Sequence, residues 1–260
     1  IPTPADGDYL VTITGRDDSG QTVIGTRTIT VDSVAPNLTS ISLAGGEVLN
    51  NAEYTVTGTY ADAVSGTAEV EYSTDYAGDP ATATWITATG SASWSATLSS
   101  LPDDLGQTFA VRARDNAGNV SAPEVRSFDV DTAAPTLAVT GGNTAPTLVY
   151  RSSDITLTGT ASDANGDPTV TVSYSKDGGS DVTIFTGVTS SWTTTLDLDA
   201  GPDNVAGNGD DGHIGDGEFV FTIIAEDTVG KTTELTRSVR IDTAPPSAEV
   251  TSVSPVVEGT

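Results

Sequence analysis

One pattern occurs three times in the sequence, and this repetition constrains the fold more than any other feature. Each copy has an alternating apolar and polar strand, an Asp-x-x-Gly turn, a second strand and a closing Asp-x-x-x-Pro. The closing aspartates Asp32, Asp131 and Asp242 are 99 and 111 residues apart. About seven short strands separated by Gly, Pro, Asp or Asn clusters fit into each interval, which is typical of a two-sheet β-sandwich.

Matches outside this pattern define the domain limits. The segment Tyr54–Asp62 matches Ile155–Asp163, and Trp94 matches Trp192, but the second copy carries 14 additional residues in an acidic, Gly-rich insertion at 197–217. The first and last segments each hold only part of a repeat. We therefore expect an all-β array of tandem sandwiches arranged as a linear rod. Residues 1–34 are expected to form the C-terminal hairpin of a truncated domain, and residues 245–260 the first strand of another repeat. Complete domains are expected at 35–133 and 134–244.

Charge and composition exclude several classes of protein. The formal net charge is −26, and only 10 of the 260 residues are Lys or Arg, so a nucleic-acid-binding surface is not expected. Cysteine is absent, which rules out disulfides and thiolate metal sites. No apolar run approaches the roughly 18 residues of a membrane span. No convergent set of catalytic side chains is visible, so we expect no enzyme activity.

The repeat ends resemble those of a known family. The segments Arg114–Ser121 and Val130–Pro135 look like the end of a bacterial Ig-like (Big-type) domain. Such domains recur in tandem in large secreted or cell-surface proteins, including long adhesins. The resemblance implies an Ig-like sandwich of about seven strands without catalytic activity, an extracellular or cell-surface location, and calcium bound at domain junctions.

Aspartates at the predicted loops form two candidate calcium sites. In an Ig-like sandwich the loop after the second strand, the loop before the last strand and the entering linker lie at one end. Calcium takes six to eight oxygen ligands, which carboxylates, amides, carbonyls and water supply. The alternative is that each Asp-x-x-Gly only forms a turn, in which the Asp side chain caps its own backbone. The candidate ligands are Asp131, Asp163, Asn165, Asp167 and Asp227 at one junction, and Asp32, Asp62 and Asp115 at the other.

These features indicate a structural function. We expect spacer repeats of a bacterial adhesin, stalk, sheath or filament. The neighbouring repeats of the same chain are the expected partners. Other copies of the chain in a fibre, or a cell-surface ligand, are further candidate partners. The alternative is a carbohydrate-binding accessory module of a secreted enzyme, in which Trp94 or Trp192 would stack on sugars, although their alternation with Ser favours core packing. The insertion at 197–217 is either a solvated loop or a second calcium-ordered one.

Overall fold

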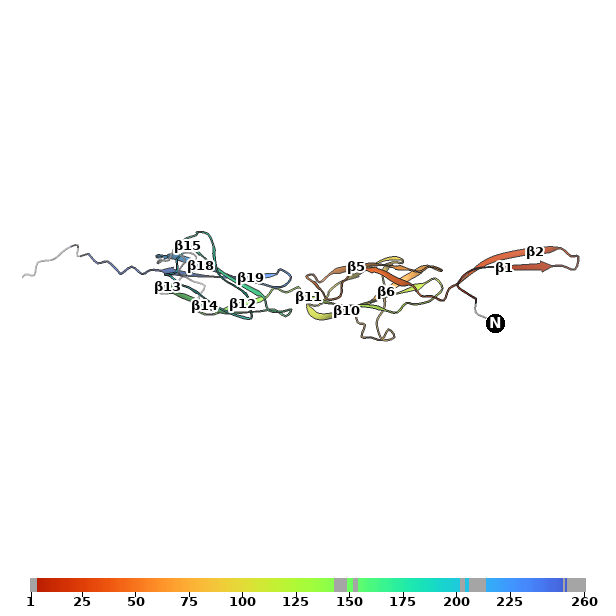
Figure 1. The fold of residues 1–260 in the computed structure, drawn as a ribbon, viewed down its shortest axis with the longest axis horizontal. Coiled ribbons are helices and arrows are strands. Elements are labelled where there is room, and N and C mark those ends of the chain that lie inside the picture. Colours follow the sequence, from red (N-terminus) through yellow and green to blue (C-terminus); the bar gives the residue numbers. More distant parts are fainter. Residues whose placement is uncertain are drawn as a thin grey trace, which may run out of the picture. The chain divides into compact units, whose positions relative to one another are not determined.

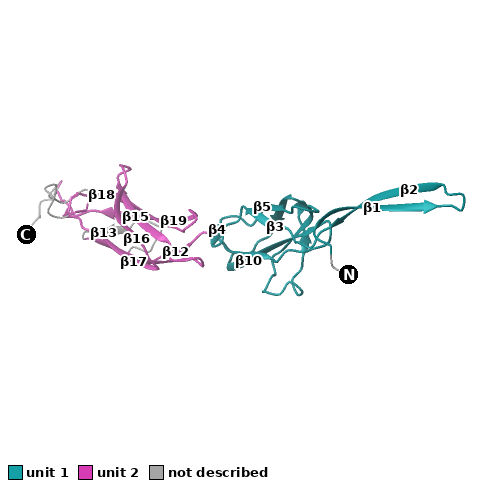
Figure 2. Ribbon diagram, turned by 45° about the vertical axis from the view of Figure 1, so that its right-hand side comes forward, with its two compact units in different colours: residues 1–132 teal, residues 133–260 magenta. Residues whose placement is uncertain are grey.

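All regular secondary structure in the described part of the chain is β-strand, as the sequence predicts. The structure is a computed structural model that describes residues 4–142, 149–151, 154–201, 204–205, 214–249 and 251. The chain divides into two compact units, residues 1–132 and 133–260 (Figures 1 and 2). No helix suited to crossing a bilayer occurs among these described residues. The all-β prediction is therefore confirmed.

The first unit begins with a two-stranded antiparallel hairpin. Strands β1 (Gly7–Arg16) and β2 (Thr22–Val31) pair without a bulge and form a sheet of their own. The turn between them is the first Asp-x-x-Gly motif, in which Gly20 adopts a φ of 89°. Only glycine adopts this conformation without strain. The glycine is therefore a conformational requirement of the turn.

The rest of the first unit is a two-sheet sandwich. One sheet has the order β3-β5-β9-β8 and the other the order β4-β11-β10-β6-β7, in which β4 runs parallel to β11. The strands are β3 (Asn37–Ile41), β4 (Glu47–Leu49), β5 (Tyr54–Ala61), β6 (Thr67–Ser73), β7 (Ile86–Thr87), β8 (Thr89–Gly90), β9 (Ser93–Leu98), β10 (Asp104–Asp115) and β11 (Glu124–Val130).

The second unit repeats this architecture. Its sheets have the orders β12-β14-β17 and β13-β19-β18-β15-β16, and β13 runs parallel to β19. The strands are β12 (Thr136–Gly141), β13 (Val149–Arg151), β14 (Ile155–Ser162), β15 (Thr169–Lys176), β16 (Val182–Val188), β17 (Ser191–Leu196), β18 (Gly217–Glu226) and β19 (Thr232–Ile241). The predicted strand within 245–260 lies largely outside the described residues.

Each sandwich closes its core around a buried tryptophan. Trp94 on β9 is 3% exposed and stacks on Phe109, with ring centroids 6.4 Å apart. Its cross-strand partner is Gly58, where a Cβ atom would overlap the Trp94 ring. Gly159 and Trp192 form the same pair in the second unit. The bulky ring therefore fits only because glycine stands opposite it.

Candidate cation-binding site

Three aspartates from separate parts of the first unit meet in space. Asp32 follows β2, Asp62 follows β5 and Asp115 ends β10, and each offers a carboxylate oxygen within 4.8 Å of the others. Asp115 is only 2% exposed. The structure thus brings together all three residues that the sequence assigns to the Asp32 junction.

Backbone N–H groups hold these carboxylates in place. Asp62 Oδ1 accepts hydrogen bonds from the amides of Val64, Ser65 and Gly66 at 2.9–3.1 Å. Asp115 Oδ1 accepts hydrogen bonds from the amides of two further residues of its turn, Gly118 and Asn119, at 2.6 and 2.8 Å. Each Asp therefore caps its own turn and also directs its carboxylate towards the other two.

Two polar side chains connect Asp32 to the sandwich loops. Ser65 donates from its hydroxyl and its amide to Asp32 Oδ2, at 2.5 and 3.1 Å. The Asn119 side-chain amide donates to the Asp32 carbonyl at 3.1 Å and to Asp115 Oδ2 at 2.8 Å. The Ser65 hydroxyl lowers the pKa of the Asp32 carboxyl from its ordinary value, because it stabilises the ionised form. Asp32 thus carries its negative charge within the cluster.

The arrangement brings three negatively charged carboxylates together. No salt bridge among the described residues involves these aspartates. At 4.8 Å, two unit charges repel by about 1 kcal/mol in water and by about 3 kcal/mol at an effective dielectric constant of about 20. A divalent cation with oxygen ligands would turn this repulsion into attraction, and carboxylates are the ligands that Ca²⁺ prefers.

The ligands predicted for the Asp131 junction are divided between the two units. Asp131 belongs to the first unit, and its convergence with the others stays a prediction. Within the second unit, Asp163 and Asp227 offer carboxylate oxygens within 4.8 Å of each other. Asn165 donates its backbone amide to Asp163 Oδ1 at 2.8 Å, whereas Asp167 is exposed and lies outside the acidic group found among the described residues.

The described ends of the acidic insertion 197–217 pack against the second sandwich. Leu198 is buried, and its backbone amide donates to Asp154 Oδ1 at 3.0 Å. Ile214 donates its amide to the Leu198 carbonyl at 2.9 Å, which joins the two ends of the insertion. Residues 202–203 and 206–213 lie outside the described residues, so the choice between a solvated and a calcium-ordered loop stays open.

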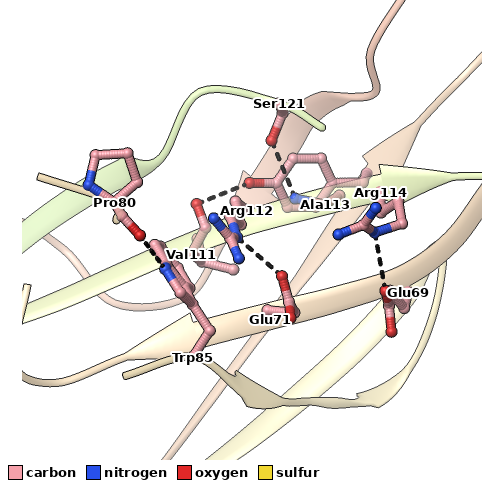
Figure 3. A network of polar contacts seen from close by, with 10 residues as sticks. Glu69, Glu71, Pro80, Trp85, Val111, Arg112, Ala113, Arg114 and Ser121 are labelled. Atoms are coloured by element: carbon pink, nitrogen blue, oxygen red, sulfur yellow. Dashed lines mark hydrogen bonds and ion pairs between the residues drawn. The ribbon is translucent and has the colours of Figure 1, made fainter. Parts of the chain in front are cut away.

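The tryptophans divide between core and surface. Trp94 and Trp192 are each 3% exposed, which confirms core packing and leaves neither ring accessible for stacking on a sugar. Trp85, which sequence reasoning did not single out, is half-buried against Arg112, whose guanidinium carbon lies 4.0 Å from the ring centroid (Figure 3). Arg112 also pairs with Glu71 at 2.8 Å. Trp85 lies outside the alternating strands that contain Trp94 and Trp192. A tryptophan in such a place was the sequence signal that could have singled it out.

Trp85 belongs to a loop whose conformation should depend on pH. Asp75 Oδ1 accepts hydrogen bonds from the Ser73 hydroxyl at 2.6 Å and the Thr84 amide at 2.8 Å, and the Ser73 and Thr84 hydrogen bonds lower the pKa of the Asp75 carboxyl to about 2. The folded pKa lies below the unfolded one, so this stabilisation is present above about pH 4 and is lost as the pH falls towards 2. We expect Trp85 fluorescence to change over this interval, and the step to be missing in Asp75→Asn. An identical acid titration in both proteins would contradict the prediction.

Comparisons with known proteins return similar solved structures of low sequence identity. No family model and no curated protein sequence matches the chain. Fibronectin(III)-like modules of Clostridium thermocellum CbhA are 18% identical, with 79% of this chain and 92% of that chain covered and a TM-score of 0.37. A Ca²⁺-stabilized adhesin with which an Antarctic bacterium binds ice is 21% identical, with 91% and 57% covered and a TM-score of 0.34. The titin I-band fragment I67–I69 is 12% identical, with 81% and 66% covered and a TM-score of 0.47.

The strand orders themselves identify the architecture. In each unit a short strand runs parallel to the last strand, and an antiparallel hairpin forms the centre of the larger sheet. This is the arrangement of Ig-like sandwiches. The chain is therefore built from tandem Ig-like β-sandwich units.

Proposed function

We propose that this chain is a non-catalytic spacer of a long extracellular bacterial surface protein, such as an adhesin, stalk, sheath or filament, and that Ca²⁺ stiffens its domain junctions. We propose for it the domain limits expected from the repeats, with partial domains at 1–34 and 245–260 and complete ones at 35–133 and 134–244. The observation that carries the proposal is the convergence of Asp32, at the start of the linker that follows β2, with Asp62 and Asp115 of the following sandwich. A cation bound by all three would join the linker to the sandwich.

The donor set of the Asp32 junction fits Ca²⁺. Three carboxylates supply hard, negatively charged oxygens, and backbone carbonyls and water would complete the six to eight ligands. Because the turn amides already hold Asp62 and Asp115, little conformational entropy would be lost on binding. We propose the equivalent ligands Asp131, Asp163, Asn165, Asp167 and Asp227 for the next junction.

Buried oxygen atoms in the second unit support the second site. Asp227 Oδ2 and the Asn165 side-chain oxygen are buried and accept no hydrogen bond from the described residues. A buried polar atom without a partner costs about 1–3 kcal/mol. Ligation of a cation would remove this cost, and Asp227 Oδ1 remains engaged with the Val229 and Lys231 amides.

A matched pair of substitutions tests the first site. Asp115 and Asp17 occupy the same position of the same turn motif, but only Asp115 belongs to the acidic cluster among the described residues. We expect Asp115→Asn to weaken Ca²⁺ binding at the Asp32 junction at least tenfold, because one anionic ligand is lost, whereas Asp17→Asn leaves binding unchanged. Calorimetric titration with Ca²⁺ measures both. Equal affinity in the two variants would show that Asp115 only forms its turn.

A further inference from the structure

The hairpin β1–β2 has the same structure as the hairpin that closes the second sandwich. When 210 is added to each residue number, the residue pairs of β1 and β2 become those of β18 and β19. Gly7 pairs with Val31 as Gly217 pairs with Ile241, and neither hairpin contains a bulge. The two segments therefore share register as well as sequence pattern.

The hydrogen bonds at both ends of the hairpins also correspond. Asp6 Oδ1 accepts hydrogen bonds from the amide and hydroxyl of Ser33 at 3.0 and 2.9 Å, and Asp216 Oδ1 accepts the same pair from Thr243 at 2.9 and 2.8 Å. At the turn, Asp17 Oδ1 accepts the Gln21 amide at 2.9 Å, as the equivalent Asp of the second unit accepts that of Lys231. Residues 6–33 thus have the local structure of a penultimate and a last sandwich strand.

The two hairpins differ in what covers one of their faces. The face of β18–β19 with Phe219, Phe221, Ile223 and Val239 is fully buried in the core of the second sandwich. The equivalent residues on β1–β2 are exposed, namely Tyr9, Val11, Ile13 and Ile29. No third strand joins the β1–β2 sheet among the described residues (Figure 1). A two-stranded hairpin is only marginally stable in water without such cover.

We propose that this apolar face of β1–β2 packs against the other strands of a third Ig-like sandwich, which a preceding segment of the same polypeptide supplies. In both described sandwiches the covering strands come before the hairpin, as β12–β17 come before β18. Tyr9 supports the assignment, because its hydroxyl donates to the Ala5 carbonyl at 2.8 Å. A tyrosine near the start of the penultimate strand makes this backbone bond in many Ig-like domains.

Two isoleucines on opposite faces of the hairpin make a matched test. Ile13 and Ile24 are 71% and 63% exposed, but the counterpart of Ile13 is the buried Ile223 and the counterpart of Ile24 is the exposed Glu234. Hydrogen exchange is measured on residues 1–260 and on the same polypeptide lengthened upstream by about one repeat. We expect the β1–β2 amides to exchange fast in the shorter chain and to slow to the rate of the β18–β19 amides in the longer one. Ile13→Asp should abolish this gain in protection, and Ile24→Asp should preserve it.

Three outcomes would overturn the proposal. The first is unchanged exchange on lengthening, and the second is equal sensitivity of the longer chain to both substitutions. The third is protection of β1–β2 in residues 1–260 that rises with protein concentration, with a dimer in sedimentation, because a second copy would then cover the face. The circular dichroism of the sandwiches shows that each variant is folded.

Discussion

Replacing Trp94 by alanine is expected to destabilise the first sandwich by about 3–5 kcal/mol, because a large ring leaves a cavity that the neighbouring sheets cannot fill. The ring is buried between Gly58 and Phe109, and both positions are fixed by strand pairing. Calorimetry should therefore show the melting transition of the first unit lowered by more than about 10 °C, while that of the second unit is retained.

Two further substitutions separate burial from other effects. Trp94→Phe should cost less than Trp94→Ala, because the Trp94 indole N–H is buried without a hydrogen-bond partner among the described residues, and phenylalanine removes that group. Trp85→Ala should cost only about 1–2 kcal/mol, the value of a partly buried cation–π contact and one hydrogen bond. Similar losses for Trp94→Ala and Trp85→Ala would contradict the assignment of Trp94 to the core.

Removing Ca²⁺ is expected to lower the stability of the chain and to loosen its junctions. A ligand that binds only the folded protein stabilises it by about 2.7 kcal/mol at a hundredfold excess over Kd. Extracellular modules work with Kd values of about 10⁻⁴ to 10⁻³ M, so millimolar Ca²⁺ would occupy even a weak site. The net charge of −26 adds repulsion that bound cations reduce.

Thermal melting and small-angle scattering measure this effect. We expect a lower Tm and a broader distribution of dimensions in excess chelator than in millimolar Ca²⁺. Mg²⁺ at the same concentration is the control for ionic strength, since it is smaller and dehydrates reluctantly. An identical Tm and an identical maximum dimension with and without Ca²⁺ would leave the aspartates as turn formers only.

Local sequence patterns were sufficient to predict the strands and turns. Alternation of apolar and polar residues along β9 and β17 predicted which side chains face the core, because side chains in a strand alternate between the two faces of a sheet. The Asp-x-x-Gly motifs predicted the turns, because the Asp side chain caps the backbone and the glycine adopts a positive φ. The repeat spacing predicted sandwich-sized units.

The convergence of Asp32 with Asp62 and Asp115 could be expected from the sequence only through the Ig-like sandwich topology that the repeats predict. The three residues come from three separate loops, and their distances depend on how strands far apart in the sequence pair. The same holds for Trp85, whose contact with Arg112 depends on the loop that follows β6. Local patterns of two to four residues are set by backbone geometry, whereas these contacts arise from long-range sheet pairing and packing, which no short window of sequence contains.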